Sequence, residues 1–196
     1  MHGVRKELLD KQAASINIPL QKLILSHQPS MAEYEKYMFA AMEQLQRENF
    51  THSVFGDIFL EDLKTYRETQ LTKVGMLAVF PLWKRNTTEI IHEFLDLGFK
   101  AIVVCINEKY LDKSFCGRII DKNFIKDLPD NVDVCGENGE FHTFVFDGPI
   151  FKNPVDYKKG EIIYREYEAP KTAADNCFSK EETAPYGFYF CDLLPV

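Results

Sequence analysis

The stretch of this sequence with the most chemically active side chains is Cys-Gly-Glu-Asn-Gly-Glu-Phe-His-Thr, residues 135–143. Its two glycines allow the backbone a positive φ or a close approach to a ligand. Its carboxylates attract a cation and can take a proton, so this stretch could bind an amine or position ammonia. The polar side chains concerned are Glu137, Asn138, Glu140, His142 and Thr143. The alternative is a solvated hairpin at Asn138-Gly139, which is a common turn pair.

Two other chemistries use the same side chains, and both are minor alternatives. Cys135, Glu137, Glu140 and His142 have the residue types of zinc ligands, but the paired spacing of known zinc sites is absent, so we predict no metal site. Cys135 could act as a nucleophile with His142 as its base. Nothing in their spacing fixes that geometry, and a cysteine before a glycine is often simply packed.

Three further positions are candidate ligand contacts. Gly56-Asp57 follows a predicted strand, and ligands of parallel sheets sit at the carboxyl ends of strands. Arg67 and Arg118 could bind phosphate or carboxylate through the forked guanidinium. For each position the plainer alternative is structural: a strand exit for Gly56-Asp57, and surface ion pairs for the arginines. The sequence contains no GxxxxGK, GxGxxG, HExxH or GxSxG motif.

The elements that must position these residues alternate in the first half of the chain. Apolar periodicity predicts helices over 4–16, from a Ser30 cap onward and over 60–74. Short strands are expected at 20–25, 53–55 and 77–80. Helix and strand in alternation indicate an α/β fold with a parallel, Rossmann-like sheet.

The second half is organised differently. A helix capped by Asn86 precedes an almost wholly apolar strand over 99–106, which we expect to be buried on both faces. A short helix near Phe124 and strands over 140–146, 161–167 and 187–193 follow, with a polar loop over 169–185. We therefore predict two domains: a partial nucleotide-binding domain over 1–84 and a smaller α+β substrate-binding domain over 85–196.

Composition excludes several classes of protein. The 196 residues have a formal net charge of −7, which argues against a nucleic-acid-binding protein. No apolar run is long enough to span a bilayer, and the charged start is unlike a secretory signal, so no membrane partner is expected. Five widely spaced cysteines without a CxxC pair predict reduced thiols and a cytoplasmic location.

Several segments together resemble the diphthine–ammonia ligase (diphthamide synthase) family. The most specific is the stretch 135–143, and the resemblance runs from residue 1 to about Phe151. The supporting segments are Met-His-Gly-Val-Arg at 1–5, Phe-Gly-Asp-Ile-Phe-Leu-Glu-Asp at 55–62, Tyr66-Arg67, Phe-Pro-Leu-Trp at 80–83, Leu111-Asp112 and Gly117-Arg118.

The resemblance implies an N-type ATP pyrophosphatase with a Rossmann-like (HUP, adenine nucleotide alpha hydrolase-like) domain. It implies a ligase that uses ATP and Mg²⁺ to adenylate a carboxylate, which ammonia then converts to an amide. The carboxylate is that of diphthine on elongation factor 2 or, in bacteria, of another acid. By the same resemblance, Gly56 and Asp57 would border the nucleotide. Catalytic roles would fall to Glu137, Glu140 and His142, and substrate contacts to Asn138, Gly139, Thr143, Arg67 and Arg118.

One feature of the family pattern is absent from these 196 residues. The family's pyrophosphate-binding loop, Ser-Gly-Gly-x-Asp-Ser, does not occur. Backbone N–H groups at such a loop bind phosphate, so weak ATP binding and an impaired ligase are expected. The alternative function is a non-catalytic short form that acts as a binding or dimerisation module. An exposed sheet edge would also favour a homo-oligomer.

Overall fold

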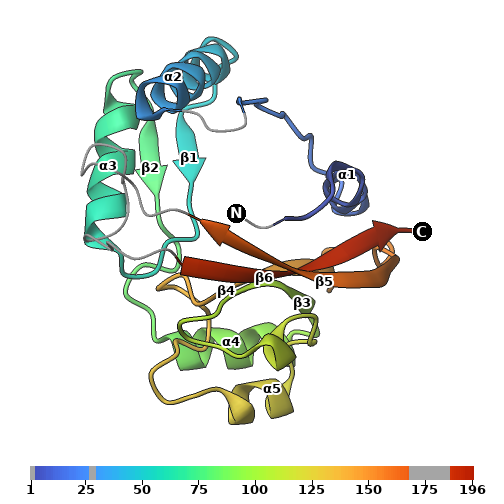
Figure 1. Cartoon of the computed structure of the whole chain (residues 1–196). Helices are drawn as coiled ribbons and strands as arrows, with labels where there is room; N and C mark the ends of the chain where they lie inside the picture. The colour runs from blue at the N-terminus through green and yellow to red at the C-terminus, as the bar shows by residue number, and fades with distance from the viewer. Residues whose placement is uncertain (1–2, 27–29, 168–185) are drawn as a thin grey trace. The chain divides into compact units, whose positions relative to one another are not determined.

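The computed structural model describes residues 3–26, 30–167 and 186–196 (Figure 1). These residues form two compact units. The first unit comprises residues 21–85, and the second comprises residues 3–20, 86–167 and 186–196. The expected first domain began at residue 1, but residues 3–20 pack in the second unit. The polar loop expected over 169–185 lies outside the described residues. The nucleotide and substrate roles of the two parts stay predictions.

The first unit is a small α/β element built around two parallel strands. It contains α2 (Met31–Arg47), β1 (His52–Val54), α3 (Glu61–Thr72) and β2 (Leu77–Val79). β1 pairs with β2 in register from His52 opposite Leu77 to Val54 opposite Val79. The parallel pairing confirms the α/β class. Figure 1 shows α3 running beside β2.

The expected strand at 20–25 is wrong. Residues 18–26 are described and form neither helix nor strand. The apolar pattern there resembles a strand, but a strand needs a neighbour to pair its N–H and C=O groups. Ile24 is 83% exposed, so the segment does not gain apolar burial either.

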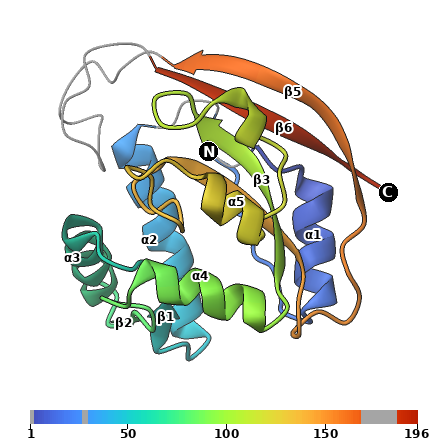
Figure 2. The ribbon, with the colours of Figure 1, turned by 90° about the horizontal axis from the view of Figure 1, so that it is seen from below.

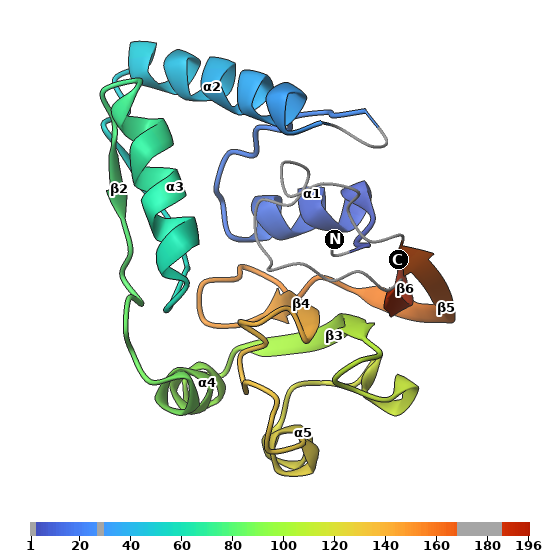
Figure 3. The ribbon, with the colours of Figure 1, turned by 60° about the vertical axis from the view of Figure 1, so that its left-hand side comes forward.

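The second unit is an antiparallel sheet with helices on both faces. Its strands are β3 (Lys100–Asn107), β4 (Phe141–Asp147), β5 (Tyr157–Tyr167) and β6 (Tyr186–Pro195), in the order β4-β3-β6-β5. The helices are α1 (Lys6–Ser15), α4 (Thr87–Asp96) and α5 (Lys122–Asp127), with a 3₁₀ turn at Lys113–Phe115. α4 and α5 cover one face (Figure 2), and α1 lies on the other (Figure 3).

The core of the second unit is centred on β3. Seven of the eight residues of β3 are buried, as expected for a strand covered on both faces. Phe124 of α5 is fully buried and packs edge-on against Phe141 of β4, with 5.5 Å between ring centroids. From the other face Leu8 of α1 is fully buried in the same cluster. The α+β character predicted for this half of the chain is thus observed.

Specific polar contacts attach α1 to the sheet. The Arg5 guanidinium donates from Nε and Nη2 to the two oxygens of Asp192 on β6, each at 2.8 Å. The Gln12 side-chain amide donates to the Val145 carbonyl of β4 at 2.6 Å.

Among the helices described, none has the length and apolar character needed to cross a bilayer.

Candidate functional site

The carboxyl group of Glu140 is the centre of the stretch singled out in the sequence. Its side chain is fully buried, one residue before β4 begins. Oε1 accepts from the Asp133 backbone N–H at 2.9 Å and from the Asn138 side-chain amide at 3.0 Å. Oε2 accepts from the Asn138 backbone N–H at 2.9 Å. A buried carboxylate needs such donors, so Glu140 fixes the loop rather than facing solvent.

The preceding loop is closed by a second carboxylate. Asp133 Oδ1 accepts from the Cys135 N–H at 2.9 Å and from the Glu137 N–H at 3.4 Å. The Gly139 N–H donates to the Gly136 carbonyl at 3.1 Å, which places Glu137 and Asn138 at the centre of a turn. The hairpin at Asn138-Gly139, which the sequence left open as the alternative, is therefore not formed. The strand before β4 in the chain is β3, more than thirty residues earlier.

The role of Asp133 was missed by sequence reasoning. The available signal was its position two residues before Cys135, because an aspartate often accepts a hydrogen bond from the backbone two residues on. Together Asp133 and Glu140 bind the backbone of one loop from its two ends. This arrangement presents Glu137, which is half-buried, and Asn138, which is exposed.

His142 and Thr143 lie where the pairing of β4 with β3 is irregular. They are consecutive in β4 and pair with Cys105 and Val103 of β3, where the register of the two strands shifts by one residue. Both are half-buried. His142 and Thr143 thus lie in the first half of β4, directly after the loop that Glu140 holds.

Cys135 is poorly suited to act as a nucleophile. Burial, then the charges of Asp133 and Glu137, raise the pKa of its thiol to about 12. The Sγ atom donates to the Thr87 carbonyl at 3.4 Å. A nucleophilic cysteine needs a lowered pKa, so the nucleophile alternative loses its chemical basis.

The same shift predicts how Cys135 responds to labelling and pH. In the folded protein at pH 8 we expect iodoacetamide to alkylate it at least about tenfold more slowly than in urea, because the folded thiol stays protonated. A thiol whose folded pKa is raised stabilises the fold below its unfolded pKa of 9.0 and loses that contribution as the pH rises toward 12. Mass spectrometry of labelled peptides measures the rate. Equal rates in the two states would contradict the burial of this thiol.

In the first unit, Asp57 and Arg67 pair with each other. Arg67 Nε lies 2.6 Å from Asp57 Oδ2 as an ion pair whose angle is too poor for a hydrogen bond, while Nη2 donates to Oδ1 at 3.3 Å. The guanidinium lies over the Phe55 ring, 4.3 Å from its centroid. It also borders a cavity of about 50 Å³ between α2 and α3. Sequence reasoning named both residues but did not pair them.

Gly56 and Arg118 have contrasting environments. A Cβ added at Gly56 would meet nothing within 4 Å, so the backbone just beyond β1 can be approached by a ligand. Arg118 lies over the Phe115 ring and donates to Asp127 at 2.8 Å. Arg118 therefore forms an ion pair with Asp127, which is the structural role that the sequence analysis gave as the alternative to ligand binding. Among the described residues, no group of three or more histidine, cysteine, aspartate or glutamate side chains is placed to hold a metal ion.

Comparison with known proteins places the Glu140 loop within a recognised domain. Residues 86–172 match the family described as the diphthamide synthase C-terminal domain. The chain is related to the diphthine–ammonia ligase family. The diphthine–ammonia ligase of Bos taurus is 29% identical over 116 residues, which are 56% of this chain and 43% of the bovine protein. The ligase of Danio rerio is 21% identical over 184 residues, which are 85% of this chain and 71% of that protein.

The matches to the mammalian ligases cover less than half of those proteins. The human diphthine–ammonia ligase is 28% identical over 116 residues, again 43% of its length. The matched part thus spans less than half of the bovine and human ligases. The matched family segment begins at residue 86, at the start of the second unit's main stretch, and includes the loop fixed by Asp133 and Glu140.

Proposed function

We propose that the chain belongs to an ATP-dependent, amide-forming ligase of the diphthine–ammonia ligase type. One observation carries the proposal: the segment that matches the diphthamide synthase C-terminal domain contains a loop rigidly organised by the buried Glu140. A loop held by two carboxylates is a suitable scaffold for orienting polar groups toward a ligand. The relatives are named for joining diphthine and ammonia, which is the source of the reaction class.

In the proposed reaction a carboxylate oxygen attacks the α-phosphorus of ATP and pyrophosphate leaves. Ammonia then attacks the acyl carbon, a proton is lost, and AMP leaves as the amide forms. Glu137 and His142 would accept that proton or hold ammonia, since a carboxylate and an imidazole do both. Asn138, Gly139 and Thr143 would line the acceptor side. We assign Glu140 a positioning role, because its oxygens are already occupied by the loop.

The nucleotide would be bordered by the end of β1. The open space beside Gly56 fits a ligand that approaches the backbone there, and Asp57 is held next to it by Arg67. Arg67 and Arg118 would contact anionic groups only by exchanging their present carboxylate partners. Mg²⁺ is usually held by one or two carboxylates together with the phosphates of the nucleotide, and Asp57 is the residue we propose for it.

The remaining partners are proposed at the level of chemistry. The acceptor is a carboxylic acid, diphthine on elongation factor 2 or another acid, and the second substrate is ammonia. The free thiols of Cys105, Cys116, Cys135 and Cys191 fit a reducing compartment such as the cytoplasm.

A second function, a non-catalytic binding or dimerisation module, is favoured by one observation. On the two-stranded sheet, Val54 is 67% exposed and Leu77 is 61% exposed. Exposed apolar side chains on paired strands commonly mark a surface that another chain covers. Sedimentation velocity and an AMP-release assay together distinguish the two functions. A dimer without ATP turnover supports the module, and a monomer that releases AMP supports the ligase.

The ligase proposal predicts AMP formation that needs both ammonium and an acid. With ATP, magnesium chloride and ammonium chloride, a panel of carboxylic acids should include one that yields AMP and pyrophosphate in equal amounts. Glu137→Gln should lower that rate by at least about a hundredfold, the usual contribution of a general base. Glu161→Gln, an exposed change on β5, is the control. Folded protein that releases no AMP with any acid would contradict ligase activity for this chain.

A further inference from the structure

The second unit has a separate cavity of about 340 Å³ on the sheet face near the start of α1. Its floor is formed by β5 and β6, and one wall by residues 3–5. At about 30 Å³ per water-sized group, this volume has room for on the order of ten heavy atoms. It is thus within the lower range of small-molecule sites, which begin near ~300 Å³.

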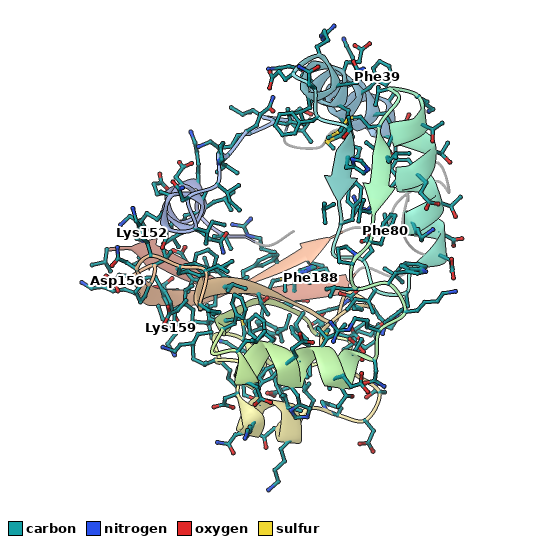
Figure 4. The ribbon with its side chains drawn as sticks, turned by 180° about the vertical axis from the view of Figure 1, so that it is seen from behind. Phe39, Phe80, Lys152, Asp156, Lys159 and Phe188 are labelled. Carbon is teal, nitrogen blue, oxygen red and sulfur yellow. The ribbon has the colours of Figure 1, made fainter. Side chains whose placement is uncertain are left out.

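The strand register brings one cationic and two apolar side chains to this floor. Ile163 of β5 lies opposite Phe190 of β6, and Arg165 is two positions further along β5, on the same face. The Arg165 guanidinium lies over the Phe190 ring, 5.6 Å from its centroid. Phe188, the neighbour of Phe190 on that face and the residue opposite Arg165, is labelled on β6 in Figure 4.

The charges around the cavity do not balance. Both oxygens of Asp192 are occupied by Arg5, so these two residues neutralise each other. Within the described part of the chain, the Arg165 guanidinium forms no ion pair or side-chain hydrogen bond, and its contact is with the Phe190 ring. A guanidinium stacked on a ring keeps its in-plane N–H groups available for a forked contact. Among the described residues, the cavity lining therefore carries one positive charge that no carboxylate neutralises, that of Arg165.

The wall opposite the floor lies close to the Phe190 ring. Gly3 has φ +66°, and a Cβ there would lie 2.9 Å from the Phe190 ring, so the chain passes directly over that ring. α1 begins immediately after this wall, at Lys6.

We propose that this cavity binds a small monocarboxylate with a compact apolar body. Arg165 would hold the carboxylate, and Phe190 and Ile163 would contact the apolar body. The single uncompensated charge matches a monoanion, whereas a phosphate dianion would face the Asp192 carboxylate with insufficient positive charge. The site is distinct from the Glu140 loop and does not depend on the ligase activity proposed above.

The test is a titration of the ¹⁵N-labelled chain with sodium benzoate, followed by amide chemical shifts. Benzoate should shift the amides of Val4, Ile163 and Cys191, which line the cavity. Benzamide, its neutral analogue, and Arg165→Gln should each weaken binding by about tenfold, the loss expected for a charge-assisted forked contact. Lys158→Gln removes the same charge from an exposed position of β5 outside the cavity and should leave the affinity within about twofold.

Each other outcome would overturn the proposal. If the cavity amides do not move with benzoate, there is no carboxylate site. If benzamide binds as well as benzoate, the cavity recognises the ring alone. If inorganic phosphate competes more strongly than benzoate, the site is a phosphate site. Equal effects of Arg165→Gln and Lys158→Gln would show that Arg165 acts only through its long-range charge and makes no direct contact with the carboxylate. Spectra of each variant without ligand show whether it is folded.

Discussion

Replacing Glu140 with alanine should lower the free energy of unfolding by about 3 kcal/mol, because the N–H donors of the loop lose their acceptor and a cavity remains at the buried side chain. The donors are the backbone N–H groups of Asp133 and Asn138. Neither finds a new partner without a rearrangement of the loop. Urea denaturation of the two proteins at equal pH measures the difference. The loop amides should also exchange with deuterium faster, while those of β3 keep their order of protection.

Two further variants show that this effect comes from the hydrogen bonds of Glu140. Glu140→Gln keeps the shape but turns an N–H₂ group toward a donor, so we expect a loss of about 2 kcal/mol. Glu161→Ala removes an exposed carboxylate from β5 and should change stability by no more than about 0.5 kcal/mol. If Glu140→Ala were as mild as Glu161→Ala, the loop would not depend on Glu140, and its positioning role in the proposed ligase would fail.

The sequence predicted best those features that local chemistry decides. Ser30 and Asn86 were expected to cap helices, and each accepts a hydrogen bond from the backbone three residues on, at 3.2 Å and 3.1 Å. Gly98, which follows α4, has φ +84°, the left-handed conformation that commonly ends a helix. Each of these signals acts within four residues of its own position, so no tertiary information is needed.

Features that depend on distant partners were not predictable in the same way. The Glu140 side chain could equally have faced solvent, and its burial depends on how the loop from Asp133 to Asn138 folds over it. Asp57 and Arg67 are ten residues apart, and their pairing depends on the turn between β1 and α3. The segment 20–25 has the composition of a strand but lacks a neighbouring strand within the described residues. Tertiary context decided all three.

The two glycines of the site loop should differ sharply in their tolerance of alanine. Gly136 has φ +74°, and a Cβ there would lie 2.8 Å from the Phe141 carbonyl oxygen, a backbone atom that cannot move aside alone. Gly139 has φ +83°, but a Cβ there would meet nothing within 4 Å. We expect Gly136→Ala to cost about 3 kcal/mol, from backbone strain plus the clash, and Gly139→Ala about 1 kcal/mol, from strain alone.

This pair of variants also bears on the proposed site. Gly136→Ala must displace either the turn that presents Glu137 or the first residue of β4, so AMP formation should fall together with stability. Gly139→Ala leaves the loop backbone in place, so a fall in AMP formation without a matching fall in stability would indicate that a ligand approaches Gly139 closely. Thermal unfolding and the ammonium-dependent assay on the same samples separate the two effects. Equal destabilisation by the two alanines would show that the Phe141 carbonyl does not constrain the loop, and the rigid-loop basis of the proposed function would have to be abandoned.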